Sequence, residues 1–520
     1  MNRMKIRGVV AAVAGSLLLS FGVNAMADSN DDLINALMEK GVLTEEEGAQ
    51  LLKGRSAEKA KKSSEIKASF KDGITWESGD KSNSISVGGR VHTDYRNFDR
   101  DISNKTTAAL PAGAQNGANE SDTFDIRRAR IEVKGKFYDA YEFLVSADLT
   151  GTSAGNTSSI LDQAYLNINW WKEVQFRFGQ FKAPFNLEKV TSSNFIDFQE
   201  RSVVNALAPN EDRGAMIWGI PKDGLTYALG VTNGEGPKNR NDSDPRVDKP
   251  EFVGRGTVNL AEFFGNKDTQ VFHFGAAGSY TELAKSNSQP AAGGIGGNGL
   301  INGGNALRTE ARGINFLTLP VFASQAGVDN TIEKTRYGLE AAIAQGPVKL
   351  QAEWATNNFK GDVANTGTFK KFDDSIDAWY VEALWLITGE NYASAYKDGA
   401  FGNIKPKSDF VHPAAISSGA YGAWEIGARY SKLDASDFSN LATATGTAVP
   451  GAAAGAVTGI NLRGSTLEAD TWTVGLKWIL NANSRILLNY VYTDFNTPIN
   501  IAGKLENSEK AFTARAQWNF

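Results

Sequence analysis

Basic side chains recur at every second position along several segments of this 520-residue chain. Between residues 128 and 137 the charged residues alternate with Ala129, Ile131 and Val133. In an extended strand this spacing puts the charges on one face and the apolar side chains on the other. A row of arginines suits anion binding, because the planar guanidinium group donates two parallel hydrogen bonds to an oxyanion.

The candidate anion-contacting residues share a place on the charged face of a predicted strand. They are Arg90, Arg128, Arg130, Lys134, Lys136, Arg177, Arg255, Arg336, Lys349, Arg429, Lys477, Arg485 and Arg515. The connection after Phe181 and its flanks add Lys182, Lys189, Arg201 and Arg213, of which Lys189 and Arg201 are the strongest candidates. In an alternative interpretation the cations brace the wall by pairing with Glu132, Glu142, Asp148, Glu340, Glu353, Glu382 or Glu425.

Other chemistry has little support in the sequence. There is no cysteine, and His92, His273 and His412 are the only histidines, so we predict no catalytic residue, no metal site and no cofactor. The formal net charge of −5 becomes −8 once three basic residues of the first 27 are removed, which argues against binding to nucleic acid.

The elements that must position these residues are strands. Alternation of apolar and polar residues predicts sixteen of them, near residues 84–95, 128–137, 141–148, 161–170, 174–182, 213–219, 225–233, 252–260, 270–280, 335–343, 348–356, 376–386, 422–431, 470–479, 485–494 and 512–520. Burying so many charges in a dry core would be prohibitive, whereas a water-filled lumen accommodates them. The pattern therefore predicts an all-β fold, a 16-stranded antiparallel transmembrane β-barrel.

Short and long connections alternate along the predicted barrel, which is typical of outer-membrane barrels. One exception, the 35-residue segment Ile387–Tyr421, falls on the short-turn side, and we expect it to fold into the channel or to pack beneath it. The last strand alternates up to the terminal Phe520. This ending resembles the signal that the outer-membrane assembly machinery recognises.

The N-terminal region divides into three predicted parts. Residues 1–27 read as a signal peptide, with basic residues, an apolar stretch and cleavage after Ala27. Residues 28–62 are predicted to form a short helical periplasmic arm, interrupted at Gly41, with a capping box at Thr44 to Glu47. A linker covers 63–83, and the barrel covers 84–520. The arm is either loosely structured, or it is a coiled coil or a tether to peptidoglycan.

Several stretches resemble the phosphate-selective porin O and P family. They are Gly179–Glu188, Thr191–Ser193, Glu200–Ser202, Asp212–Gly214, Leu386–Glu390 and Ala423–Tyr430. The resemblance implies a trimeric sixteen-stranded channel, with loops folded inward to form a constriction and a ladder of basic side chains that guides anions. This sequence departs from a dedicated phosphate site, because no lysine or arginine lies between Ser192 and Gln199 and Asp197 is acidic.

The expected function is therefore that of an outer-membrane porin for small anions such as phosphate or pyrophosphate. A broader anion channel, a general porin without anion selectivity, and a cell-wall tether or adhesin are the alternatives. The expected partners are outer-membrane lipid and lipopolysaccharide, two further copies in a homotrimer, the barrel assembly machinery through Phe520, and small anions.

Overall fold

The computed structural model describes residues 29–70, 73–99, 122–150, 160–234, 249–284, 306–319, 321–322, 331–365, 368–443, 457–458, 460–461, 465–501 and 504–520. The predicted signal peptide lies outside these residues and stays a prediction. Among the described helices, none is both long and apolar enough to cross a membrane.

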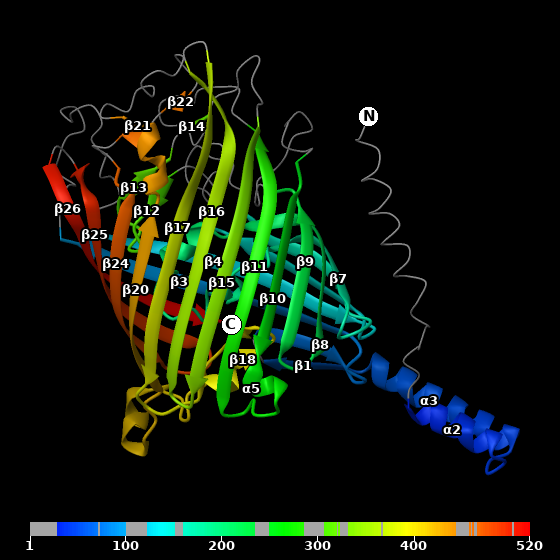
Figure 1. Cartoon of the computed structure of the whole chain (residues 1–520). Coiled ribbons are helices and arrows are strands. Elements are labelled where there is room, and N and C mark those ends of the chain that lie inside the picture. Colours follow the sequence, from blue (N-terminus) through cyan, green and yellow to red (C-terminus); the bar gives the residue numbers. More distant parts are fainter. Residues whose placement is uncertain are drawn as a thin grey trace, which may run out of the picture. The chain divides into compact units, whose positions relative to one another are not determined.

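Within the described residues, sixteen antiparallel strands close into a barrel (Figure 1), as predicted. The strands are β3 (Ser84–Phe98), β4 (Thr123–Phe137), β5 (Tyr141–Asp148), β6 (Leu161–Ile168), β7 (Gln175–Lys182), β8 (Glu211–Lys222), β9 (Leu225–Thr232), β10 (Glu251–Asn259), β11 (Gln270–Ala284), β15 (Thr331–Gln345), β16 (Val348–Asn365), β17 (Thr368–Leu386), β20 (Ala423–Asp434), β24 (Glu468–Ile479), β25 (Ser484–Ile501) and β26 (Lys504–Asn519). Each pairs with its neighbour in this order, and β26 pairs with β3.

The smaller elements lie in the connections and ahead of the barrel. They are α2 (Ser29–Glu39), α3 (Glu45–Ser64), β1 (Ile66–Phe70), β2 (Ile74–Ser78), α4 (Leu187–Val190), η2 (Val203–Ala206), α5 (Leu260–Phe263), β12 (Ala306–Arg308), β13 (Asn315–Thr318), β14 (Val321–Phe322), η4 (Tyr392–Ala395), β18 (Tyr396–Lys397), β19 (Ala400–Phe401), η5 (Pro413–Ser418), η6 (Ser436–Leu441), β21 (Ala442–Thr443), β22 (Val457–Thr458) and β23 (Ile460–Asn461). The stretch predicted to be a plain linker contains β1 and β2, whose five-residue runs are too short for a clear alternation.

The helical arm begins its second helix as the sequence predicts. The Thr44 backbone N–H and hydroxyl both donate to Glu47 Oε2 at 2.9 Å, and the Glu47 N–H donates to the Thr44 hydroxyl at 3.2 Å. These contacts form a reciprocal capping box, which satisfies N–H groups that have no partner within the first turn of a helix.

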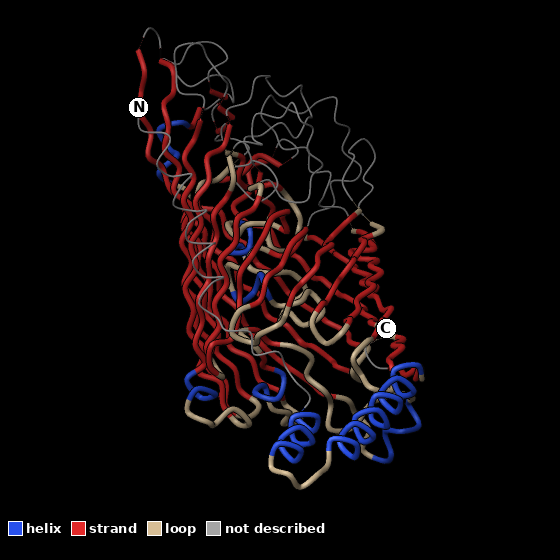
Figure 2. Tube along the Cα trace, turned by 90° about the vertical axis from the view of Figure 1, so that its right-hand side faces the viewer, coloured by secondary structure: helices blue, strands red, loops and turns tan. Residues whose placement is uncertain are grey.

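Alternation holds along the wall and sorts side chains between the two faces. On β15, Tyr337, Leu339 and Ile343 are exposed on the outer face, whereas Arg336 and Glu340 on the inner face are buried. The outer row meets lipid and the inner row meets polar groups, which is the arrangement that a membrane barrel requires. Figure 2 shows the tilted strands of the wall, with loop and short helical segments inside the ring.

Several strands run further than predicted at one end. β16 continues to Asn365 and β17 begins at Thr368, whereas apolar alternation ends near Thr356 and resumes near Ile376. Beyond the lipid the outer face of these strands meets water, whereas inner-face residues such as Phe359 and Phe372 are buried in an apolar cluster. The regular alternation of apolar and polar residues therefore ends, although the backbone hydrogen bonds continue. Sequence periodicity therefore marks the membrane-embedded part of each strand and misses its extension.

The chain closes the barrel at its last residue. The Phe520 backbone N–H donates to the Gly89 carbonyl at 3.0 Å, and the Gly89 N–H donates to the Phe520 carbonyl at 2.8 Å. A Cβ added at Gly89 would lie 2.4 Å from the Arg130 carbonyl oxygen and 2.7 Å from the Phe520 ring. Only glycine lets the terminal ring and β4 approach this closely.

We predict that Gly89→Ala weakens barrel closure. The added methyl group must displace backbone as well as the Phe520 ring, and overpacking of this kind costs about 1–3 kcal/mol. The measurement is the temperature at which the folded, heat-modifiable band is lost on electrophoresis. Gly256→Ala is the matched control, because a Cβ there meets no atom within 4 Å. Equal midpoints for the two variants would contradict the prediction.

Candidate ion pathway

The connection between β7 and β8, residues 183–210, folds into the lumen. It carries α4 and η2, and most of its apolar side chains are buried, Phe185, Leu187 and Phe198 among them. The Gln199 N–H donates to Asn489 on β25 at 3.1 Å, and Gln517 on β26 donates to the Asn194 carbonyl at 3.0 Å. We call this segment the inner loop. The sequence left its position open and the family resemblance suggested it.

Ion pairs fasten the inner loop to distant parts of the wall. Asp197 Oδ2 lies 2.7 Å from the Lys349 ammonium on β16, and Glu200 Oε1 lies 3.0 Å from the Arg515 guanidinium on β26. Arg127 on β4 also engages Glu200, through both of its oxygens, at 2.8 and 3.2 Å. The loop is thus held from opposite sides of the barrel and forms a partition across its interior.

Nearby basic side chains determine the protonation state of the carboxyl groups of Glu200 and Asp197. Burial alone would raise the pKa of Glu200, but Arg127 and Arg515 outweigh it and hold that pKa well below its usual value. Lys349 and Lys477 likewise outweigh burial at Asp197 and lower its pKa. At neutral pH both groups are ionised, so the pairs act as charged contacts.

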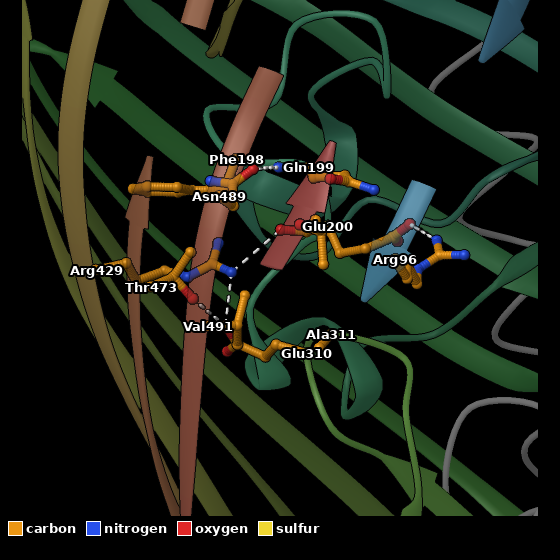
Figure 3. Close-up of a pocket in the computed structure, with 11 residues that line it drawn as sticks. Arg96, Phe198, Gln199, Glu200, Glu310, Ala311, Arg429, Thr473, Asn489 and Val491 are labelled. Carbon is orange, nitrogen blue, oxygen red and sulfur yellow. Dashed lines mark hydrogen bonds and ion pairs between the residues drawn. The ribbon is translucent and has the colours of Figure 1, made fainter. Parts of the chain in front are cut away.

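A second inward segment, residues 306–319, contains the β12–β13 hairpin. Its Glu310 accepts a hydrogen bond from Arg429 on β20 at 2.7 Å and another from the Val203 N–H of the inner loop at 2.9 Å. Arg429 also contacts Glu188 of the inner loop, 3.2 Å away. Figure 3 shows Arg429, Glu310 and Glu200 around a cavity of about 10 Å³, which has room for about one water molecule.

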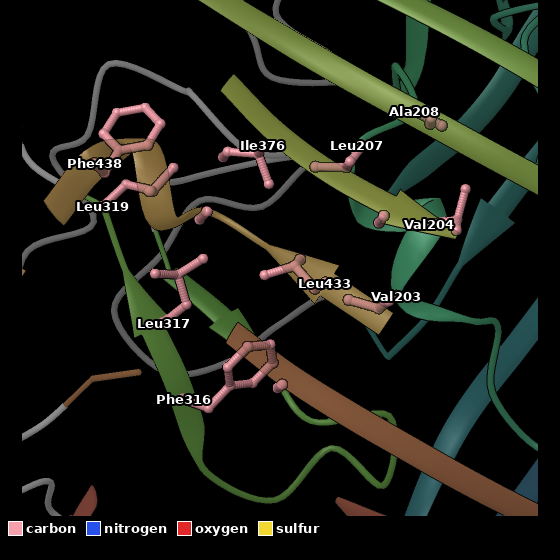
Figure 4. Close-up of a cluster of buried hydrophobic side chains, with 14 of the residues drawn as sticks. Val203, Val204, Leu207, Ala208, Phe316, Leu317, Leu319, Ile376, Leu433 and Phe438 are labelled. Atoms are coloured by element: carbon pink, nitrogen blue, oxygen red, sulfur yellow. The ribbon is translucent and has the colours of Figure 1, made fainter. Parts of the chain in front are cut away.

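Apolar packing supports the same arrangement (Figure 4). Phe316, Leu317 and Leu319 of the hairpin belong to one buried cluster with Val203, Val204 and Leu207 of the inner loop. Ile376 and Leu433 of the wall and Phe438 of η6 complete the cluster. Because the two segments share one core, each stabilises the position of the other.

A third inward segment comes from the exceptional connection 387–421, as the sequence suggested. Its Tyr392 donates to Glu425 on β20 at 2.9 Å, and Tyr396 lies 2.7 Å from His273 Nδ1 on β11. Tyr392 and Phe401 share a buried cluster with Leu187 and Phe198 of the inner loop. The segment therefore reaches into the barrel and supports the inner loop.

Because of the three inward segments, the inward side chains are much more exposed on one side of the lumen than on the other. On β15 to β25 the inward polar side chains are at most 6% exposed, which applies to Glu340, Lys349, Gln351, Glu353, Glu382, Glu425, Arg429, Lys477 and Arg485. On β4 to β8 and on the facing side of the inner loop, Lys134 is exposed and Arg130, Arg177, Lys182, Arg201 and Arg213 are half-buried. We call the first side the sealed wall and the second the open wall.

Carboxylates neutralise part of the open wall. Arg130 lies 2.8 Å from Asp148 and 2.6 Å from Asp162, and Glu132 pairs with Arg90 on the adjacent strand β3. Lys189 is buried beside Glu211, at 3.4 Å.

Four open-wall cations differ from these, since no ion pair to a carboxylate is found for them within the described residues. They are Lys134, Arg177, Lys182 and Arg201. Lys182 and Arg201 contact backbone carbonyl groups of the inner loop, Arg201 at 2.8 Å to both Glu188 and Thr191. No direct ion pair therefore cancels their positive charge within the described residues, although Glu211 and Glu188 lie near enough to attract Lys182 and Arg201.

Further arginines on β4 and on the hairpin were not predicted from the sequence. Arg127 lies at a register shift between β3 and β4, so it turns toward the interior although strict alternation points it outward. Arg308 and Arg312 lie on the hairpin. The nearby charge of Arg127, together with burial, lowers the pKa of Arg312 to about 10. Arg128, which was predicted, is buried with two nitrogens unpartnered in the described structure.

Several predicted residues lie in buried ion pairs, among them three on β10, β15 and β20. Arg255 lies 2.6 Å from Glu340, Arg336 pairs with Glu251, and Arg429 joins Glu188 and Glu310. These contacts correspond to the alternative bracing role, so we leave the three out of the pathway proposed below. Lys136, at the rim, lies 2.5 Å from Asp139.

The described residues contain no group of three or more histidine, aspartate and glutamate side chains arranged to hold a metal ion. His92 hydrogen-bonds Asn194 of the inner loop at 3.1 Å, and His273 contacts Glu340 at 2.9 Å. Both histidines therefore contact inward segments, His92 through Asn194 of the inner loop and His273 through Tyr396 of the third segment.

We predict that Asp197→Asn loosens the inner loop, because it leaves the Lys349 ammonium buried without its partner, at a cost of about 3–5 kcal/mol. A higher or noisier single-channel conductance at pH 7 is the expected result. Lys349→Met in the same chain should restore quiet conductance, since the unpaired charge is then gone. Identical traces for Asp197→Asn and the unaltered protein would contradict this role.

The pH dependence of the same pair follows from the lowered pKa of Asp197. A depressed carboxyl pKa contributes stability above the unfolded value of about 3.9 and loses it as the pH falls through the lower folded value. The part of the conductance that Asp197→Asn alters should therefore be steady from pH 8 to pH 5 and change only below about pH 4. A change near neutral pH would contradict this assignment.

Comparison with known proteins found a sequence relative and several solved structures that resemble the chain. The chain is 26% identical over 460 residues to Porin O of Pseudomonas aeruginosa, covering 86% of this chain and 91% of that protein. Among solved structures, the channel DcaP of Acinetobacter baumannii matches with a TM-score of 0.44 and 10% identity, covering 84% and 98% of the two chains. OprB of Pseudomonas putida matches with a TM-score of 0.41 and 9% identity, covering 85% and 95%. The family model described as phosphate-selective porin O and P matches residues 85–520, so the chain belongs to that family of outer-membrane porins.

Proposed function

We propose that this porin passes small anions by diffusion along the open wall and catalyses no reaction. The observation that carries the proposal is the set of cations without a carboxylate partner, Lys134, Arg177, Lys182 and Arg201. A narrow passage with low-dielectric walls focuses their field on the permeant ion. The sealed wall, with its many glutamates, is covered by the inner loop and contributes less to the field in the passage.

Phosphate and pyrophosphate are the solutes that fit this proposal best within the family described as phosphate-selective. The acidic Asp197 counted against phosphate in the sequence analysis. Its pairing with Lys349 at 2.7 Å supports phosphate, since the pair leaves little net negative charge at that point of the loop. Lys182 and Arg201 lie on or beside the same loop and add positive charge.

The remaining assignments concern assembly and export. A signal peptide cleaved after Ala27 would deliver the chain to the periplasm, and the terminal Phe520 would be read by the barrel assembly machinery. The exposed apolar belt, with Leu229 and Leu339 among its residues, suits outer-membrane lipid, and lipopolysaccharide would lie on the outer leaflet. A homotrimer is the assembly that the family resemblance implies.

The test of the proposal is the reversal potential of the protein in a planar bilayer across a KCl gradient. Preference for chloride over potassium is expected, and phosphate added to the same bilayer should reduce the chloride current. Preference for potassium would overturn the proposal and leave a general porin. A correctly folded protein without conductance would favour a tether or adhesin role for the arm.

We predict that Lys134→Gln lowers the ratio of anion to cation permeability about two- to five-fold, because one unpaired charge of about 1 kcal/mol or less is removed from the field in the passage. Lys360→Gln is the matched control, since Lys360 is exposed at the end of β16 and lies 2.9 Å from Asp373. Equal permeability ratios in the two variants would show that Lys134 does not face the permeant ions.

A further inference from the structure

Arg177 on β7 differs from the other arginines of the open wall in what holds its guanidinium group. The guanidinium carbon lies 4.2 Å from the centre of the Tyr165 ring and 5.0 Å from the centre of the Trp218 ring. These rings belong to β6 and β8, the strands on either side of β7. Aromatic contacts attract a cation without neutralising it, so they fix the position of Arg177 and preserve its charge.

Hydrogen bonding orients the same group. Arg177 Nε donates to Asn167 Oδ1 at 3.3 Å, and the Trp218 indole N–H donates to the same oxygen at 2.8 Å. Asn167 is in turn held by Glu142 and Gln175, to which its amide donates at 3.1 and 2.9 Å. The amide therefore anchors one edge of the guanidinium group and aligns it with the Trp218 ring.

The other edge of the guanidinium group is open. Neither terminal nitrogen of Arg177 has a hydrogen-bond partner within the described residues, and neither is among the buried atoms that lack one. The nearest carboxylate, Glu142, directs its oxygens to Asn167 and Asn169, at 3.1 and 2.9 Å. Two donors of a planar group are thus free to bind a ligand with two adjacent oxygens.

We propose that Arg177 forms an oxyanion subsite that makes this porin discriminate carboxylate and phosphate from halide. An oxyanion accepts both terminal N–H groups at once, whereas chloride, a single sphere, cannot use the paired geometry. The aromatic rings keep the guanidinium group from collapsing onto a protein carboxylate, so the subsite is formed before the ion arrives. The inference rests on the proposed anion pathway and adds a residue that sorts the anions within it.

The experiment compares bi-ionic reversal potentials of KCl against potassium phosphate and against potassium acetate at pH 7. Arg177→Lys keeps the charge and removes the planar pair of donors. We expect the permeability to phosphate and acetate relative to chloride to change about five-fold, while the preference for anions over potassium stays within about two-fold. Lys134→Gln is the comparison, and it should shift all the anions together.

A second variant, Asn167→Asp, places a carboxylate of nearly the same shape against Arg177 and should shift the oxyanion-to-chloride ratio in the same direction as Arg177→Lys. If Arg177→Lys does not fold, Asn167→Asp is the variant that tests the oxyanion subsite. Unchanged ratios in folded variants of an anion-selective channel would overturn the subsite and leave the proposed function standing. Preference for potassium in the unaltered protein would overturn the proposed function itself.

Discussion

The shared charge of Arg429 is the interaction on which the interior of the barrel depends. One guanidinium group reaches Glu188 of the inner loop at 3.2 Å and Glu310 of the hairpin at 2.7 Å. Those two carboxylates also accept the Ser202 and Val203 backbone N–H groups. Because Arg429 is only 2% exposed, removing it would leave the two buried carboxylates without their shared cation. The wall, the loop and the hairpin therefore hold one another in place.

This arrangement decides which charges a permeant ion meets. The chain as a whole is negative, at −5, which taken alone would favour cations. Many of the lumen carboxylates, however, lie on the sealed wall, where Lys349, Lys477 and Arg429 pair with acidic groups behind the inner loop. The cations without such partners lie on the other side. Selectivity in this account follows from which charges are covered, and net charge is a poor guide to it.

The sequence predicted much of the fold because lipid imposes a period of two on every strand that it touches. All sixteen strands and the inward side chains of most of them could be assigned in this way. The limits have the same origin. Strand extensions beyond the lipid, such as the end of β16 at Asn365, carry no such period, and the register shift at Arg127 reverses a side chain that alternation would place outside.

The candidate site was harder to predict, because alternation identifies the inner face but not what covers it. Arg336 and Arg429 share the pattern of Arg130 and Arg177, yet they are buried under segments whose folding depends on contacts far apart in the chain. Arg308 and Arg312 have no strand periodicity and were missed. Only the three-dimensional packing of the hairpin brings them near Arg127.

The most direct test of the division between an open and a sealed wall is the accessibility of single cysteines, since the chain contains none of its own. Four single variants would be treated with a charged thiol reagent during bilayer recording. Lys134→Cys and Gln163→Cys, the latter on β6, test the open side, and Gln351→Cys and Lys477→Cys test the sealed side. Rapid reaction and a drop in current are expected for the first pair, and little reaction for the second. Equal reaction rates at all four positions would contradict this division.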